Sequence, residues 1–348
     1  RFALGENFMR IKLLSATVML SAGILGTVAL TGCEGSSDVT VINFSHTQSP
    51  NSLTDLTAMK FKEIVEKASN GKIEVHIFTN CGLSGGDLTK ALELVQTGNI
   101  DIHSCAPANI ANYDPRFYAF WLPFLFPNQE SLLKFCSSEK VHKEVNSWCN
   151  ALEMEMLGIN SAGSRQISNS KKEIKSPKDL ESMNIRVPGA NVFISLYRNY
   201  FHANPTAMDF SEVYTSLQQQ AIDGQENPIA VFASSKFDEV QKYVTLWDGV
   251  RDTTIWVMSS KTLEDLPDDK AQMIRDAATE ALAWGNDYLA KTEGDIIENL
   301  RKKGVIITEL SDEVKAEFQE QCKGIYTEFE PTIGKDVIEL FTKGYLED

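Results

Sequence analysis

From residue 39 onward, short β-rich segments alternate with longer amphipathic segments, and this alternation restricts the chain to few folds. The predicted strands span 39–44, 72–78, 100–103, 156–161, 184–187, 203–207, 221–225, 240–246, 253–259 and 305–308. Helical spacing of apolar residues predicts helices over 51–69, 87–97 and 268–303, a helical segment over 130–157 that is either continuous or broken once, and more helices up to 346. Such alternation is typical of α/β proteins with largely parallel sheets. The predicted fold class is therefore α/β.

The length and charge of the chain narrow the classes of function. A chain of 348 residues has the length of two ordinary domains. Its 48 acidic residues outnumber 33 basic ones, which gives a net charge of −15. A nucleic-acid-binding protein needs a basic surface, so the charge argues against that class. It does not argue against an anionic small ligand, because a few Arg residues can dominate the potential of a cleft.

The N-terminal segment has the composition of an export signal. Arg10 and Lys12 precede an uncharged run over 13–30, and the sequence Leu-Thr-Gly leads into Cys33. This ending resembles the bacterial lipobox, in which the cysteine is lipidated and becomes the mature N-terminus. We therefore predict a signal peptide over 1–32, lipidation of Cys33, a tether over 33–38 and an extracytoplasmic, lipid-anchored protein. A transmembrane anchor is the alternative.

Removing the predicted signal changes the charge and the cysteine count. Residues 1–32 hold three basic residues and one acidic residue, so the mature chain carries −17. The cysteines beyond Cys33 are odd in number, which leaves at least one of them without an intramolecular partner. They are Cys81, Cys105, Cys136, Cys149 and Cys322. Cys136 and Cys149 are predicted on one helix, about 20 Å apart, too far for a disulfide.

No motif indicates catalysis, a metal or a cofactor. The sequence has no GxSxG, HExxH or P-loop motif, and no GxGxxG after a strand. The five histidines are scattered and no His/Cys group has the spacing of a metal site. We predict no catalytic residue, no metal and no cofactor. An extracellular α/β enzyme acting on an anionic substrate, or a ligand-sensing lobe of a signalling system, are the alternatives.

Two arginines and an asparagine suggest a site for a carboxylate. Arg165 is predicted just past a strand, and Arg186 inside an apolar strand, where a guanidinium that cannot lose its proton requires an anion. Asn227 precedes a proline after a strand, which predicts a helix N-terminus at the strand end. The alternative role for Arg186 is an internal salt bridge. The alternative role for Asn227 is that of an ordinary helix cap.

These residues lie in segments that resemble the DctP-type solute-binding proteins of TRAP transporters. The resemblance rests on PTAMDFSEVYTSLQQQAIDGQENPIAVFASSKFDEVQKYV at 205–244, and within it most specifically on DGQENP at 223–228. It also includes GSRQIS at 163–168, SPKDLESMNIRVP at 176–188, NGKIEVHIF at 70–78 and LPDD at 266–269. It covers nearly all of the predicted mature chain.

The resemblance implies a two-lobed, periplasmic-binding-protein-like fold of type II character, with a long helix bracing both lobes. Lobe I would comprise 39–162 plus about 251–290, and lobe II 163–250 plus about 291–348. The lobes would close around an organic acid and deliver it to a TRAP permease of small and large membrane subunits. A sugar acid, a C4-dicarboxylate or a similar carboxylate would be the ligand.

The resemblance also implies the roles of individual residues. Arg186 would be the main carboxylate partner, Arg165 and Asn227 would complete the clamp, and Phe210 would pack against the ligand. Four further ligand-binding candidates are His46, Thr47, Glu226 and Trp247. Sialic-acid-binding members carry a Glu and an Arg where this chain has Ala106 and Asn109, so the resemblance does not favour sialate.

Overall fold

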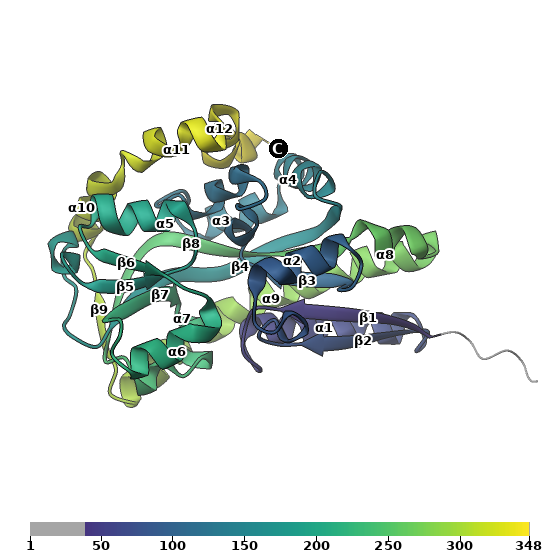
Figure 1. The fold of residues 1–348 in the computed structure, drawn as a ribbon, viewed down its shortest axis with the longest axis horizontal. Helices are drawn as coiled ribbons and strands as arrows, with labels where there is room; N and C mark the ends of the chain where they lie inside the picture. The colour runs from purple at the N-terminus through teal and green to yellow at the C-terminus, as the bar shows by residue number, and fades with distance from the viewer. Residues whose placement is uncertain (1–38, 348) are drawn as a thin grey trace, which may run out of the picture. The chain divides into compact units, whose positions relative to one another are not determined.

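A nine-stranded mixed sheet forms the centre of the protein, as seen in a computed structural model that describes residues 39–347. The strand order is β2-β1-β3-β8-β4-β7-β5-β6, and β9 pairs with β8 (Figure 1). The strands are β1 (Thr40–His46), β2 (Ile73–Phe78), β3 (Ile102–Cys105), β4 (Met154–Asn169), β5 (Asn184–Val187), β6 (Asn204–Ala207), β7 (Gly224–Pro228), β8 (Tyr243–Ser259) and β9 (Ile306–Glu309). Helices between these strands confirm the predicted α/β class.

The helices follow the strands in the predicted alternation. They are α1 (Leu53–Ala68), α2 (Leu88–Gln96), α3 (Gln129–Ser137), α4 (Glu139–Asn150), α5 (Asn191–Ser195), α6 (Phe210–Gln218), α7 (Ile229–Ser234), α8 (Ser260–Asp265), α9 (Asp268–Lys302), α10 (Asp312–Cys322), α11 (Ile325–Ile333) and α12 (Lys335–Thr342). No helix among the described residues has both the length and the apolar character needed to cross a membrane.

Two long antiparallel strands, β4 and β8, connect two groups of shorter strands. The end of β8 pairs with β3, which leads on to β1 and β2, whereas the end of β4 pairs with β7, which leads on to β5 and β6. The ladder between β4 and β8 is irregular at three places, one of them between Arg165 and Ile167. Bulges of this kind re-aim side chains and occur often beside functional sites.

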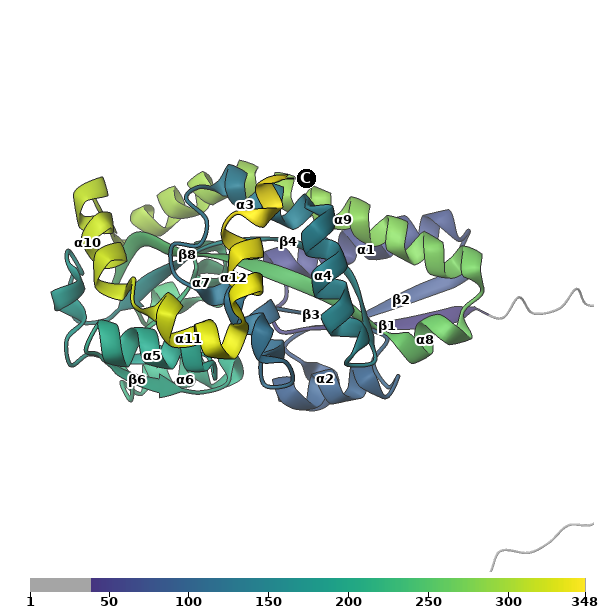
Figure 2. The same cartoon turned by 90° about the horizontal axis from the view of Figure 1, so that it is seen from above.

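The long helix α9 confirms the prediction over 268–303. It starts after Pro267 with Asp268 and Asp269 in its first turn and ends with Arg301 and Lys302, charges that suit the helix dipole. Its N-terminal half packs on α1 (Figure 2), and its C-terminal half shares a hydrophobic cluster with α7. The helix therefore contacts elements beside both strand groups.

The C-terminal helices return to the α3 and α4 region. Phe341 on α12 packs against Phe135 on α3, with ring centroids 4.7 Å apart, and stacks on Trp148 of α4 at 6.0 Å. The predicted lobe boundaries stay a prediction. These ring contacts join a segment assigned to lobe II to residues assigned to lobe I.

The structure corrects several local expectations. The sheet is mixed, because the pairs β3–β8, β4–β7 and β4–β8 are antiparallel. The two strands predicted over 240–246 and 253–259 form one strand, β8. The helical segment predicted over 130–157 is broken once, at Ser138, which caps α4. Cys136 and Cys149 consequently lie on different helices.

Candidate functional site

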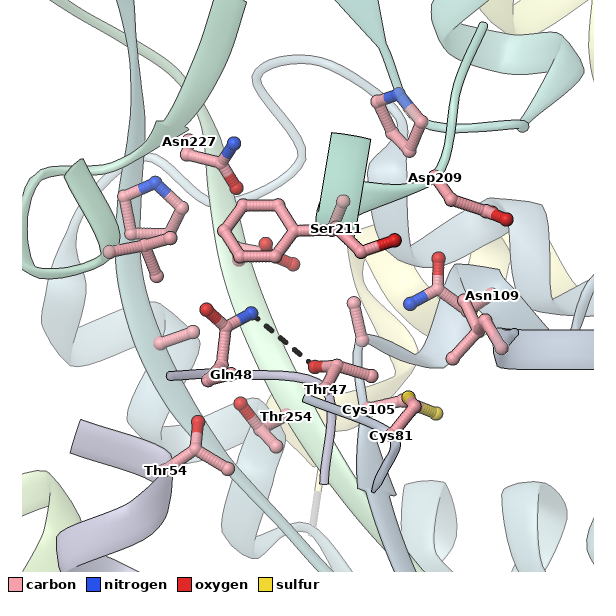
Figure 3. Close-up of a pocket in the computed structure, with 18 of the residues that line it drawn as sticks. Thr47, Gln48, Thr54, Cys81, Cys105, Asn109, Asp209, Ser211, Asn227 and Thr254 are labelled. Atoms are coloured by element: carbon pink, nitrogen blue, oxygen red, sulfur yellow. Dashed lines mark hydrogen bonds between the residues drawn. The ribbon is translucent and has the colours of Figure 1, made fainter. Parts of the chain in front are cut away.

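A cavity lies between the two strand groups. On one side its walls come from β4, β5, β7 and the start of α6, and on the other from the turn after β1, the start of α1, the end of β3 and the turn at 107–110. Figure 3 shows Asn227 of β7 facing across the cavity from Thr47, Gln48, Thr54 and Thr254. The cavity thus collects side chains that are far apart in the sequence.

Arg186 is buried in the cavity wall on β5, where β6 and β7 pair on either side of it. Its Nε and Nη2 donate to the carbonyl oxygen of Met208, at 3.1 and 2.7 Å. No carboxylate among the described residues lies within 4.0 Å of its guanidinium. Burial lowers the pKa of Arg186 to about 10; Glu226 opposes this shift and the charge of Arg165 adds to it. Arg186 therefore remains a cation at neutral pH without an anion beside it.

Arg165 is buried too, but its charge is neutralised within the protein. Its Nη2 donates to Oε1 of Glu226 at 2.7 Å, its Nε donates to the other oxygen of that carboxylate, and its Nη1 donates to Oδ2 of Asp252. Although burial opposes the charge, the two carboxylates raise the pKa of Arg165 above its usual range. Burial raises the pKa of Glu226, and Arg165 opposes that rise.

Strand pairing explains how this cluster forms. Arg165 lies on β4 between β7 and β8, paired with Pro228 on one side and Val250 on the other. Glu226 and Asp252 thus reach it from the two neighbouring strands. The prediction that Arg165 lies just past a strand is wrong, because β4 continues to Asn169.

Asn227 lies inside β7 rather than at a helix N-terminus. Its Oδ1 accepts from Nη2 of Arg165 at 3.2 Å, and its Nδ2 donates to Oε1 of Gln225. The helix cap predicted for Asn227 is wrong, because α7 begins at Ile229 with Pro228 as the flanking residue and no side-chain cap. Asn227 still lines the cavity, held in place by Arg165.

The remaining candidates fall into two groups. Phe210 and Thr47 line the cavity, and the Phe210 ring centroid lies 5.9 Å from the guanidinium carbon of Arg186. His46, Glu226 and Trp247 are fully buried and do not line it.

His46 and Trp247 have packing partners of their own. Nε2 of His46 contacts Oδ1 of Asp55 at 3.2 Å, and its Nδ1 accepts from the backbone N–H of Gln48 at 3.3 Å. The hydrogen bond with His46 lowers the pKa of Asp55. Trp247 packs against Phe124, Phe201 and Phe318. His46 therefore positions the turn that carries two cavity residues, whereas Trp247 belongs to the core.

Several cavity residues escaped the reading of the sequence. Besides Asp209 and Asp252, the polar ones among them are uncharged: Gln48, Thr54, Asn80, Asn109, Ser211, Thr253 and Thr254. Only Asn109 carried a signal, through its match to a family position. Uncharged polar residues are common at turns, in the first turns of helices and in strands, so nothing local distinguishes these from ordinary surface residues.

The cysteines show no sign of reactivity. Cys33 lies outside the described residues, and the other five are buried and unpaired. Cys81 and Cys105 line the cavity, yet burial raises the pKa of the Cys81 thiol to about 12 and that of Cys105 further. Both are thus protonated thiols, which are poor nucleophiles. Within residues 39–347, no group of three or more His, Cys, Asp or Glu side chains could hold a metal ion.

Known proteins resemble this chain over most of its length. The DctP family, described as bacterial extracellular solute-binding protein, family 7, matches residues 44–332. The C4-dicarboxylate-binding periplasmic protein DctP of Shewanella loihica is 32% identical over 307 residues, which are 86% of this chain and 88% of that protein.

Solved structures of solute-binding proteins also resemble this chain over most of its length. The sugar acid binding protein DctPAm of Advenella mimigardefordensis, in complex with galactonate, has a TM-score of 0.83 and 29% identity, and the match covers 89% of this chain and 99% of that one. A TRAP periplasmic solute-binding protein of Sulfurospirillum deleyianum with bound succinate has a TM-score of 0.82 and 29% identity, over 87% of this chain and 98% of that one. This chain therefore belongs to the DctP family of extracellular solute-binding proteins, whose members are receptors and not enzymes.

Proposed function

We propose that this protein is the extracytoplasmic receptor of a TRAP transporter and binds an organic acid through Arg186. The observation that carries this proposal is the buried guanidinium of Arg186, which lines a cavity without a carboxylate of the described chain beside it. A buried charge is costly unless it is paired, and a guanidinium matches a carboxylate through two parallel hydrogen bonds. A ligand carboxylate would supply the missing anion.

The neighbouring residues support the same role. Asn227 is held at the cavity by Arg165, and the Phe210 ring lies beside Arg186. Relatives carry names or bound ligands of this chemistry, among them succinate and galactonate. We propose that Arg165 acts mainly by fixing Asn227, with at most the one remaining N–H of its Nη1 directed to the ligand.

Transport requires a partner in the membrane. We propose that two lobes, joined by β4, β8 and α9, close around the acid and that the closed form is recognised by the small and large permease subunits. The long ladder between β4 and β8 supports this, because it connects the two strand groups beside the cavity.

The ligand test uses the purified protein. Native mass spectrometry should reveal a bound small acid, and a panel of organic acids should raise the melting temperature in a thermal-shift assay. At 100 times the Kd, a ligand stabilises the folded state by about 2.7 kcal/mol. The control is the primary amide of each active acid, which has no charge for Arg186. An equal shift by acid and amide, or no shift by any acid, would contradict the proposal.

We also propose that the mature protein is anchored through a lipid on Cys33. The motif leading into Cys33 supports this. A bacterium expressing the full chain and fed a labelled fatty acid should incorporate label into the wild type but not into Cys33→Ser. Cys322→Ser, which removes a buried thiol elsewhere, is the control and should stay labelled. Label retained in Cys33→Ser would exclude this anchor.

A further inference from the structure

The two sides of the cavity differ in charge. Its ionisable lining residues, apart from the two protonated thiols, are Arg165, Arg186, Asp209 and Asp252. Arg165 already faces the carboxylates of Asp252 and of Glu226 behind it. The other cation of the described lining, Arg186, is therefore the one that can receive a ligand anion. Arg186, on the β5 side, is therefore the cation of the described lining that has no carboxylate within 4.0 Å.

A second ligand carboxylate would meet no cation of the described lining. The opposite wall is uncharged, with Thr47, Gln48, Thr54, Asn80 and Thr254. Asp209 also lines the cavity, and burial together with nearby Asp87 and Glu212 raises the pKa of its carboxyl. Repulsion between carboxylates already present in the protein would increase with another anion. A dicarboxylate would thus leave one end unpaired.

The lining also has buried polar atoms that have no hydrogen-bond partner among the described residues. Oε1 of Gln48 is buried without a partner, while its Nε2 donates to Oγ1 of Thr47 (Figure 3). Oγ1 of Thr253, a hydroxyl that can donate as well as accept, is also buried without a partner. A buried acceptor without a donor costs free energy, so a ligand group that donates to Oε1 of Gln48 would recover part of that cost. An ionised carboxylate only accepts hydrogen bonds, whereas a hydroxyl group both donates and accepts them.

From these observations we infer that the ligand is a polyhydroxylated monocarboxylate, such as an aldonate, and not a dicarboxylate. The inference rests on the proposed function, since it assumes that the carboxylate pairs with Arg186. The single carboxylate occupies the Arg186 side, and the hydroxyl groups donate to Gln48 and to the carboxylate of Asp209 and exchange hydrogen bonds with the threonines opposite. The single carboxylate then meets the one cation of the described lining that has no carboxylate within 4.0 Å.

Matched ligands test the inference by calorimetry. Galactonate, galactarate and galactitol share one carbon skeleton and carry one, two and no carboxylates, and gluconate, erythronate and tartrate vary its stereochemistry and length. We expect at least one of the aldonates to bind at least about 10-fold more tightly than every diacid, including succinate, because an unpaired charge is costly to bury. Galactitol should not bind detectably.

The outcomes separate the two proposals. A diacid that binds as tightly as the best aldonate would overturn the inference and leave the Arg186 proposal standing. Binding of galactitol equal to that of galactonate, or no binding by any acid, would overturn both.

A substitution tests the hydroxyl contacts directly. Gln48→Leu removes the unpartnered acceptor and should weaken aldonate binding about 10-fold, in the range expected for one buried hydrogen bond. Binding of an unhydroxylated acid of the same length, hexanoate, should not weaken. Gln272→Leu, at an exposed position of α9, is the matched control and should change neither affinity. Equal weakening of both acids by Gln48→Leu would contradict the hydroxyl contact.

Discussion

Arg186→Met is expected to reduce the affinity for the organic acid about 1000-fold, because truncating one member of a buried, hydrogen-bonded charge pair costs roughly 2–5 kcal/mol or more. Methionine keeps most of the side-chain volume but can donate no hydrogen bond. Arg186→Lys keeps the charge but not the planar fork, and its loss should be smaller. Isothermal titration calorimetry with the acid identified by mass spectrometry measures both.

Without ligand, the Arg186→Met variant is expected to remain folded. Met208, whose carbonyl oxygen loses the two donors of Arg186, still donates its backbone N–H to the carbonyl of Val187 at 3.3 Å. Removing a buried cation without an anion also removes its desolvation cost. The free energy of unfolding of the ligand-free protein should therefore change by no more than about 1 kcal/mol, the net value of a typical hydrogen bond.

The matched control removes an arginine from a different place. Arg275 pairs with Glu155 outside the cavity and is partly exposed, so Arg275→Met removes the same charge without touching the lining. The affinity of Arg275→Met for the acid should equal that of the wild type. If Arg186→Met bound the acid as tightly as Arg275→Met, Arg186 would not be the carboxylate partner.

Local sequence patterns predicted the elements that depend on local forces. The helix α9 has helix-forming residues, acidic residues in its first turn and basic residues in its last, all readable within 35 residues. Arg186 could be recognised because it interrupts an apolar strand, and burial there follows from its neighbours. Both predictions needed no knowledge of strand pairing.

The partners of Arg165 could not be predicted in this way. Glu226 and Asp252 lie 61 and 87 residues away, and only the antiparallel pairing of β4 with β7 and β8 brings them together. The same pairing explains the wrong cap at Asn227, because the ladder with β4 extends to Pro228 and prevents an earlier helix start. Where sheet pairing competes with a local helix signal, the sequence alone cannot decide between them.

Arg165→Met is expected to destabilise the protein by about 3–5 kcal/mol, because it leaves buried carboxylates without their cation. Among the described residues, Arg165 is the side chain that donates to the carboxylate oxygens of Glu226, so the substitution leaves them without a side-chain donor. Asp252 is affected less, because its Oδ1 still accepts from the N–H groups of Trp121 and Thr253, at 2.8 and 2.9 Å. Chemical denaturation of the ligand-free protein measures this loss. Arg186→Met, which should cost little stability, is the comparison that separates a structural arginine from a ligand-binding one.

The pH dependence of the stability of Arg165→Met and a second substitution test whether the buried charge of Glu226 causes that loss. Burial already raises the pKa of Glu226, and without Arg165 it should rise further above the unfolded value. Between those two pKa values the folded state binds more protons, so the deficit is complete at high pH and shrinks as the pH falls through the folded pKa. Glu226→Gln in the Arg165→Met background removes the buried charge and should recover much of the stability at pH 7. Two results would show that the Arg165–Glu226 pair does not hold β4 to β7. Either Arg165→Met would be as stable as the wild type, or the double variant with Glu226→Gln would be no more stable than Arg165→Met alone.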